Sequence, residues 1–395
     1  MKTELAEPAD PVPDPDESGD LGEPAATVRA AEQLLTARLG APVELADPED
    51  LGGSGRSVVL RVRVARNPFS LPRTLVVKHA TTSAPCETAD SFAREVASCQ
   101  LFTALHADDR PGPALIASDS DQRLLVLEDL GRSGTVAGAL LAGDSAHAQR
   151  SLLGWARALG RLHAATAGRE PDFAALLRRQ GRRDACDPVQ RHRRDALDGL
   201  PMMLDRELDV ATGPEVCAEA KHAGELLDGV RYRAFSPADL GPDNAVVVGR
   251  TVRFIDFEGG GFRTALLDAA QLGAPLPSSF WSGYALPRGV AESMLSAWRD
   301  EAAVLWPELG DRAAAAGLLL DGQLLWTWLC TWWLLPGPEV PARGGVLVDR
   351  WGRLAEDAAT LDRTALAEHA DAVRAALCHR FDVHGPPLPV YPALA

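Results

Sequence analysis

The chain has 395 residues, 46% hydrophobic and 24% charged, and this ordinary globular composition excludes a wholly disordered or fibrous protein. Its 40 Lys and Arg residues against 55 Asp and Glu residues give a formal net charge of −15. Such an acidic balance argues against a general nucleic-acid binder and against docking on anionic membranes, and it permits a cationic substrate. The length is enough for two domains or one large domain with two lobes.

Residues 1–25 form an acidic, proline-rich segment with eight acids and one base, Lys2. This segment has almost no large apolar residues to offset its ordering entropy, so we expect it to be disordered. It has neither a basic start nor an apolar stretch, so it does not read as a signal peptide. The six cysteines contain no C-x-x-C pair, which indicates free thiols in a reducing compartment.

Apolar residues recur at helical spacing over 25–39. Glycines at 52–55 predict a turn, and the alternating residues that follow, up to Val64, predict a strand. Proline-containing turns then lead to a second strand at 74–78, which completes a hairpin. A helix over 91–106 and strands over 115–117 and 123–130 follow.

After about residue 131 the pattern becomes helical, with helices expected over 135–142, 149–165, 172–179 and 215–227. Two short β runs, 245–248 and 252–255, flank a Gly-Arg turn, and the chain beyond them is mostly helical. The most apolar stretch, 324–335, is shorter than the roughly 20 residues of a membrane span, so we expect a buried helix and a soluble, cytoplasmic protein.

These patterns predict an α+β protein with a disordered tail (1–25), a small β-rich lobe (26–130), a large helical lobe (131–380) and a proline-rich tail (381–395). The β-rich lobe carries three features that suit a phosphate ligand. The glycines at 52–55 allow close backbone approach to phosphates, or form only a hairpin turn. Lys78 is one of only three lysines and ends an apolar strand, so it either contacts phosphate or extends to solvent. Glu95, in the next helix, either pairs with Lys78 or is a solvated acid.

The most informative pattern lies around the two β runs of the helical lobe. A loop containing Pro237 and Pro242 carries Asp239 and, five residues later, Asn244, and Asp256 follows the second run. A hairpin would present these three side chains at one end. Asn244 and Asp256 supply the oxygen ligands that Mg²⁺ prefers, which leaves Asp239 to accept a hydroxyl proton.

This order resembles the layout of phosphoryl-transfer kinases. Asp239-Leu-Gly-Pro-Asp-Asn244 and Ile255-Asp-Phe-Glu258 closely resemble motifs of the aminoglycoside phosphotransferase and choline kinase-like family. Leu159-Gly-Arg-Leu-His163 looks like its L-G-x-L-H helix, and Leu125-Val-Leu-Glu128-Asp-Leu-Gly131 looks like its hinge. The resemblance covers about residues 30–335 and implies a bilobal protein-kinase-like fold.

The resemblance further implies a phosphotransferase that uses ATP (or GTP) and Mg²⁺ and acts on a hydroxyl of a small molecule, such as an aminoglycoside-like compound, an amino alcohol or a sugar. Asp239 would be the catalytic base, and Asn244 and Asp256 would bind the metal. The residues implied to contact the nucleotide are Gly53, Ser54, Gly55, Lys78, Glu95, Glu128 and Leu130.

One motif departs from the family pattern, because its H-G-D reads Pro237-Ala238-Asp239 here. The family's His is thought to brace the loop, and we expect Pro237 to brace it by restricting the backbone. Asp268 resembles the Asp of the family's D-L-A position and is expected to brace the same loop. No group assigned to nucleotide or metal is lost.

The acceptor is less well specified. Asp243 and Glu258 border the loop and suit an amine, and eight of the nine tryptophans follow residue 280, where they form either a cation–π wall or helix core. Two alternatives stay open: a catalytically silent kinase-like protein that binds a nucleotide or partner, and a protein or lipid kinase. The four polar groups at 78, 239, 244 and 256 argue against the first. The absence of an activation segment ending in A-P-E argues against the second.

Overall fold

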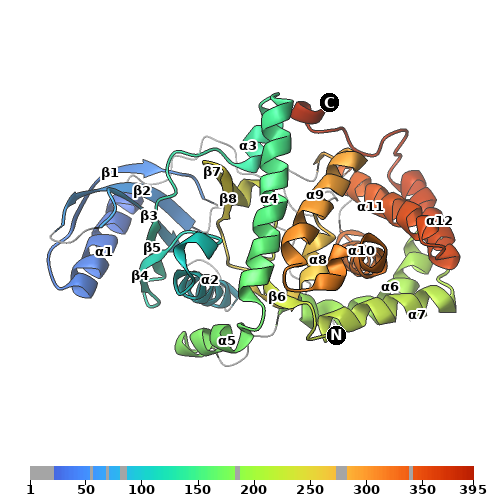
Figure 1. Ribbon diagram of the computed structural model, residues 1–395, viewed down its shortest axis with the longest axis horizontal. Helices are drawn as coiled ribbons and strands as arrows, with labels where there is room; N and C mark the ends of the chain where they lie inside the picture. Colours follow the sequence, from blue (N-terminus) through green and yellow to red (C-terminus); the bar gives the residue numbers. More distant parts are fainter. Residues whose placement is uncertain are drawn as a thin grey trace. The chain divides into compact units, whose positions relative to one another are not determined.

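The structure is a computed structural model that describes residues 22–53, 57–67, 71–80, 87–182, 187–272, 283–337 and 341–395. The chain forms two compact units. The first comprises Met1–Ser83 and Ile116–Asp129, with the short piece Pro336–Pro338. The second comprises Ala84–Leu115, Leu130–Leu335 and Glu339–Ala395. Figure 1 shows strands dominating the first unit and helices the second.

The first unit is built on a five-stranded sheet with the order β1-β2-β3-β5-β4. The pairs β1–β2, β2–β3 and β3–β5 are antiparallel. Helix α1 (Gly22–Leu39) packs Ala31 and Leu35 into the core of this sheet. The strands are β1 (Glu44–Asp50), β2 (Ser57–Arg66), β3 (Thr74–Ala80), β4 (Leu115–Asp119) and β5 (Leu124–Glu128).

Two sequence predictions for this unit need correction. Strand β1 was not predicted, because its sequence Glu-Leu-Ala-Asp-Pro-Glu-Asp is acidic, contains a proline and does not alternate. It is held by antiparallel pairing with β2, with an irregularity between Ala46 and Glu49. The predicted disordered tail ends too late, since α1 already begins at Gly22, and the rest of that prediction lies outside the described residues.

The second unit is mostly helical and contains two small two-stranded sheets, β6–β9 and β7–β8. Its strands are β6 (Arg233–Ser236), β7 (Ala245–Val248), β8 (Thr251–Phe254) and β9 (Gly261–Thr264). Its helices are α2 (Glu87–Thr103), α3 (Val136–Leu141), α4 (Ser145–Thr166), α5 (Glu170–Arg179), α6 (Pro188–Leu208), α7 (Pro214–Gly224), α8 (Ala265–Ala269), α9 (Arg288–Ala302), α10 (Arg312–Leu334), α11 (Pro341–Thr360) and α12 (Thr364–Arg380).

The predicted division into a β-rich part and a helical part is confirmed. Helix α6 was not predicted, because its sequence is rich in arginine and contains Pro201. Strands β6 and β9 were also not predicted as a pair. They pair across 24 intervening residues, with Phe235 opposite Phe262, so no local pattern marks them.

The main core of the second unit lies among α6, α7, α10, α11 and α12. Several of the late tryptophans belong to it. Trp328 is fully buried and donates its indole N–H to the Ala196 carbonyl at 3.0 Å, and Trp351 donates to Thr331 Oγ1 at 2.9 Å. Their hydrogen bonds stay inside the core, so these tryptophans are packing residues and not walls of a ligand cage.

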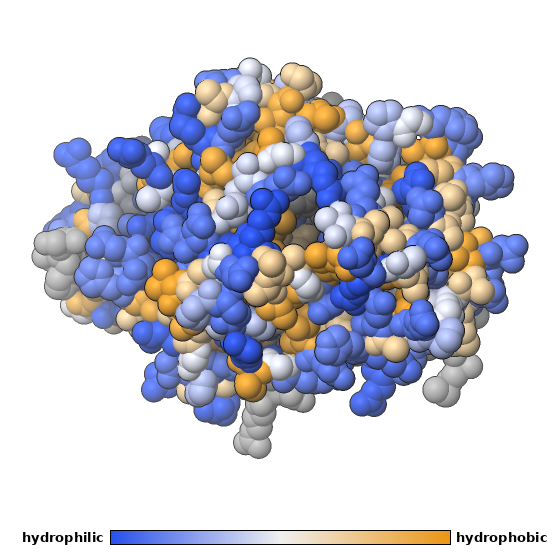
Figure 2. Space-filling model, turned by 45° about the vertical axis from the view of Figure 1, so that its right-hand side comes forward, coloured by the Kyte–Doolittle hydropathy of each residue, from blue (hydrophilic) through white to orange (hydrophobic). Residues whose placement is uncertain are grey.

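Helix α10 is long and apolar enough, by length and composition, to cross a membrane. In the structure, 61% of its most apolar window is buried inside the protein, which agrees with the predicted buried helix. Hydrophilic residues cover most of the molecular face in Figure 2, with smaller hydrophobic areas between them.

Candidate active site

The β7–β8 hairpin places the two expected metal ligands at the same end. Ala245 pairs with Phe254 in its register, so Asn244 immediately precedes the paired strands and Asp256 closely follows them. The Ile255 amide donates to the Asn244 carbonyl at 3.0 Å, which extends the pairing to this end. Both side chains are half-buried. The hairpin thus brings a carboxylate residue and an amide residue to one end, and their oxygens are donors that suit a hard cation.

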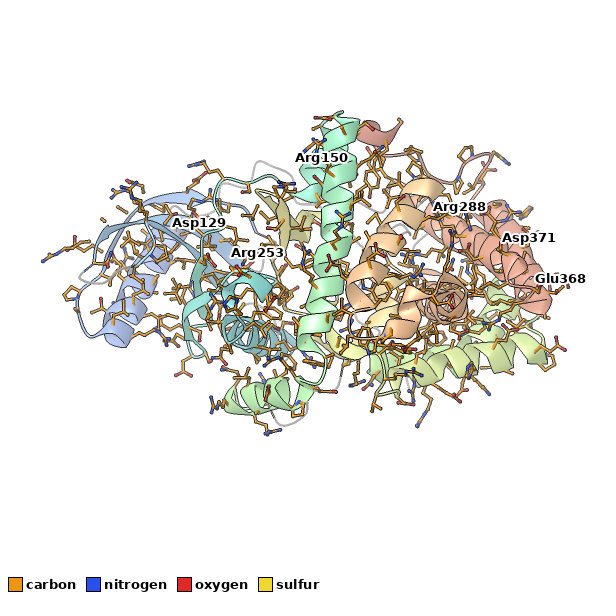
Figure 3. The ribbon with its side chains drawn as sticks, viewed as in Figure 1. Asp129, Arg150, Arg253, Arg288, Glu368 and Asp371 are labelled. Carbon is orange, nitrogen blue, oxygen red and sulfur yellow. The ribbon has the colours of Figure 1, made fainter. Side chains whose placement is uncertain are left out.

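The surrounding chain fixes this hairpin from two sides. The Val247 amide donates to the Gly134 carbonyl at 2.8 Å, and the Phe254 amide donates to the Pro111 carbonyl at 2.7 Å. Arg253, labelled in Figure 3, donates to the Gly112 carbonyl at 3.4 Å. The end of the hairpin is therefore held by backbone groups that are far away in sequence.

Asp239 lies within electrostatic range of the same end. Loss of hydration, together with the neighbouring carboxylates of Asp243 and Asp256, raises its pKa to about 6. The Gly241 amide opposes this shift by donating to Asp239 Oδ1 at 3.1 Å. The Asp239 residue as a whole keeps solvent-exposed surface.

A buried hydrogen-bond network supports the loop that carries Asp239. Trp298 donates its indole N–H to His163 Nδ1 at 3.0 Å, so the ring proton of the neutral His163 must sit on Nε2. From there His163 donates to Asp268 Oδ2 at 3.1 Å, and Ser236 Oγ donates to Asp268 Oδ1 at 2.7 Å. The Ala238 amide in turn donates to Ser236 Oγ at 3.1 Å. Asp268 therefore braces the loop, as expected, and does so through Ser236.

The departure at Pro237 and Ala238 has a visible backbone consequence. Ala238 has φ +72°, in the left-handed region where a glycine would be unstrained. Pro237 is buried. On either side of it in sequence, Ser236 Oγ donates to Asp268 and accepts a hydrogen bond from the Ala238 amide. The hydrogen bonds of Ser236 therefore hold this loop, and the bracing by Pro237 stays a prediction.

Sequence reasoning missed how the three glycines after Glu258 place helix α2. A Cβ on Gly260 would lie 2.6 Å from Phe235 Cζ and 2.8 Å from Ser98 Oγ of α2. Buried Arg94, also in α2, donates to the Gly260 carbonyl at 3.1 Å. The run Gly-Gly-Gly in the sequence was the available signal, since consecutive glycines indicate close backbone approach. Through these contacts α2 packs directly against the chain that follows Asp256.

The remaining predicted site residues lie on both units. Glu95 is buried in α2 of the helical unit, whereas Lys78 lies on β3 of the sheet unit, opposite Val59 and Leu125. The two therefore belong to different units, and their pairing stays a prediction. Glu128 ends β5 in the sheet unit, and Leu130 begins the next segment of the helical unit.

The glycine turn joins β1 to β2, where the Leu51 amide donates to the Val59 carbonyl at 2.9 Å. A Cβ on Gly53 would collide with the Ser57 carbonyl oxygen, so this position requires glycine. The predicted site residues Ser54 and Gly55 lie outside the described residues.

Among the described residues, no group of three or more His, Cys, Asp or Glu side chains is arranged to hold a metal ion. If Asn244 and Asp256 bind the metal as the sequence predicts, they would supply two of the six ligands of octahedral Mg²⁺, and the other positions would fall to water and phosphate oxygens. This arrangement is the one expected where a metal binds together with a phosphorylated substrate.

Comparisons with known proteins give structural matches only. No protein-family model matches the chain, and no curated protein matches it by sequence. Solved structures that it resembles include a choline/ethanolamine kinase family protein from Mesorhizobium loti, with 16% identity, a TM-score of 0.44, and coverage of 88% of this chain and 99% of that one. A putative fructosamine-3-kinase from Haemophilus somnus 129PT matches at 12% identity and TM-score 0.44, covering 90% and 99%.

A third match is the streptomycin–ATP–APH(2″)-IIa ternary complex, at 12% identity and TM-score 0.44, covering 79% of this chain and 93% of that one. These matching structures are small-molecule kinases, the class that the sequence motifs resemble. The function proposed below rests on the residues of this chain.

Proposed function

We propose that the protein transfers the γ-phosphate of ATP, or of GTP, to a hydroxyl group of a small molecule. The observation that carries the proposal is the placement of Asn244 and Asp256 at one end of the β7–β8 hairpin, with the Asp239 carboxylate close to Asp256. A metal-ligand pair beside a base is the minimum that hydroxyl phosphorylation requires. The acidic chain is proposed to act in the cytoplasm on free small molecules, without nucleic acid or membrane.

Each residue has a separate part in the proposed reaction. Asn244 and Asp256 would hold Mg²⁺, which when bound neutralises phosphate charge. Asp239 accepts the proton of the acceptor hydroxyl and orients its oxygen. A carboxylate with a pKa near 6 is still largely ionised at neutral pH, and it is a stronger base than an ordinary aspartate.

The nucleotide contacts are carried over from the motif resemblance. Lys78 is proposed to contact phosphate oxygens as a point charge, and Glu95 to pair with it. Backbone groups at Gly53, Glu128 and Leu130 are proposed to contact the nucleotide. Catalysis would consist mainly of positioning and charge neutralisation.

Substitution of the base tests the proposal. Asp239→Asn keeps the shape and removes the proton acceptor, so transfer should fall by about 10²–10⁴-fold while nucleotide binding persists. The measurement is ADP release from ATP and Mg²⁺ with a panel of hydroxyl compounds: choline, ethanolamine, streptomycin and glucose. Asp300→Asn, at an exposed position on α9, is the matched control and should be fully active.

Two results would count against the assignment. Full turnover by Asp239→Asn would show that Asp239 is not the base. If the wild type binds nucleotide but releases no ADP with any acceptor, whether in the panel or beyond it, a catalytically silent kinase-like protein would be favoured.

A further inference from the structure

An ion pair holds the chain at the point where β5 leaves the sheet. The pairing of β5 with β3 ends at Glu128, opposite Leu75, and Asp129 is the next residue. Arg61 of β2 donates from Nε to Asp129 Oδ2 at 2.9 Å and from Nη2 to Asp129 Oδ1 at 3.2 Å. Asp129 is labelled in Figure 3. A two-point contact between side chains therefore takes over where the backbone pairing ends.

The Arg61 side chain joins three separate pieces of the sheet unit. The strand order places β3 between β2 and β5, so Arg61 reaches across β3 to Asp129. On that path Arg61 lies opposite Val76, and Val76 lies opposite Leu127. In the other direction Arg61 Nη1 donates to Glu49 Oε2 at 3.3 Å, and Glu49 is its partner on β1. One guanidinium thus links β1, β2 and the chain that follows β5.

The pair lies on the face of the sheet that carries Lys78. Leu60, which precedes Arg61, packs into the core with residues of α1, so Arg61 points to the opposite face. Val59 points to the same face as Arg61 and lies opposite Lys78 in the β2–β3 register. The side chains of Arg61 and Asp129 are only 14% and 4% exposed, so salt and water screen their attraction little.

We propose that Arg61 and Asp129 are positioning residues for the base of the bound nucleotide. Glu128 and Leu130, whose backbone groups are the proposed nucleotide contacts, flank Asp129 in the sequence. Because both carboxylate oxygens of Asp129 are fixed by one guanidinium, the peptide groups on either side of it are restrained in orientation. The inference rests on the proposed function and adds Arg61, a residue that no sequence motif marked.

Substitution of either partner tests the inference. Arg61→Gln removes the guanidinium, and Asp129→Asn keeps the shape of the side chain but removes its charge. The ligand is whichever of ATP and GTP the wild type binds more tightly with Mg²⁺, and calorimetry measures its Kd. We expect this Kd to rise about tenfold in each variant, as for loss of a hydrogen bond to a charged group. Inorganic tripolyphosphate, which has no base, should compete with the nucleotide at its wild-type inhibition constant.

Three further variants control the measurement. Arg63→Gln removes a neighbouring pair on the same strand, in which the side chains of Arg63 and Asp47 are 51% and 70% exposed, and should leave every constant unchanged. Arg61→Lys keeps the charge without the two-point geometry, so the nucleotide should stay weakly bound. The double variant Arg61→Gln/Asp129→Asn should bind no more weakly than either single variant, because both act through one contact.

The outcomes separate the inference from the function on which it rests. A wild-type Kd for the nucleotide in Arg61→Gln or Asp129→Asn would overturn the inference. Equal weakening of nucleotide and tripolyphosphate would also overturn it, because the pair would then support the sheet as a whole and not the base. Wild-type binding by Arg61→Lys would show that charge alone suffices and would exclude the two-point role. A wild type that binds neither nucleotide overturns the proposed function, and this inference with it.

Discussion

Two residues with side chains adopt the left-handed backbone at the candidate site: Ala238 at φ +72° and Asp256 at φ +62°. Such conformations cost about 1–3 kcal/mol each and persist where the surroundings determine them. The proposed metal-binding role of Asp256 requires its carboxylate, which glycine would not supply. The sequence could predict Asp239, Asn244 and Asp256 from their types and spacing. It could not reveal the strain at Ala238, because alanine is ordinarily found at negative φ and its presence does not indicate a left-handed backbone.

A buried histidine outside the site gives a stability prediction. His369 of α12 packs edge-on against Trp351, with centroids 5.9 Å apart, and desolvation lowers its pKa from 6.5 to about 4. The unfolded chain then binds the proton more readily than the folded chain between these values. The contribution of neutral His369 to the free energy of unfolding should therefore be complete above pH 6.5. As the pH drops from 6.5 toward 4, the free energy of unfolding should fall by roughly 3 kcal/mol.

Urea denaturation at several pH values measures this effect. His369→Phe keeps an aromatic ring against Trp351 and should flatten the fall between pH 6.5 and 4. His379→Gln, at an exposed position on the same helix, should leave the profile of the wild type intact. An identical pH profile for wild type and His369→Phe would contradict the assignment.

At the scale of elements, local patterns located the β7–β8 hairpin correctly, because a Val-rich run and a second short β run flank the turn at Gly249. They missed elements that depend on distant partners. Strand β6 is four residues long and is defined by its pairing with β9. Likewise, the buried hydrogen-bond network that links His163 to Ser236 joins α4, α8 and α9 to the loop. The spacing of residues in the sequence indicates that a His and an Asp could take part in such a network, but not that they meet.

The close approach of α2 to the segment after Asp256 gives a prediction for an element contact. Gly260→Ala would place a methyl group 2.6 Å from Phe235 Cζ and 2.9 Å from the Phe257 carbonyl oxygen. The contact must open, so we expect a loss of about 1–3 kcal/mol in the free energy of unfolding and a drop in ADP release. Denaturant unfolding and the ADP assay measure the two effects.

Gly317→Ala is the control for this substitution. A Cβ at this position in α10 meets nothing within 4 Å, so alanine should stabilise the helix by about 0.5–1 kcal/mol and leave activity unchanged. Equal unfolding midpoints for Gly260→Ala and wild type would show that the contact is not tightly packed.

At the scale of the whole molecule, composition and charge predicted a globular acidic protein, and the residue patterns along the chain predicted a β-rich part and a helical part. The boundary between the two units was not predictable in detail. Helix α2 lies in sequence between β3 and β4 of the first unit, yet it belongs to the helical unit, where Arg94 and Ser98 lie against Gly260.

Thermal melting with ATP or GTP, each with and without Mg²⁺, tests the central claim most directly. A ligand that binds only the folded state at a hundredfold excess over its Kd stabilises the protein by about 2.7 kcal/mol. We predict a Mg²⁺-dependent rise in the melting temperature of the wild type that Asp256→Ala abolishes. A rise that is the same without Mg²⁺ or in Asp256→Ala, or no rise with either nucleotide, would contradict the assignment of a metal–nucleotide site.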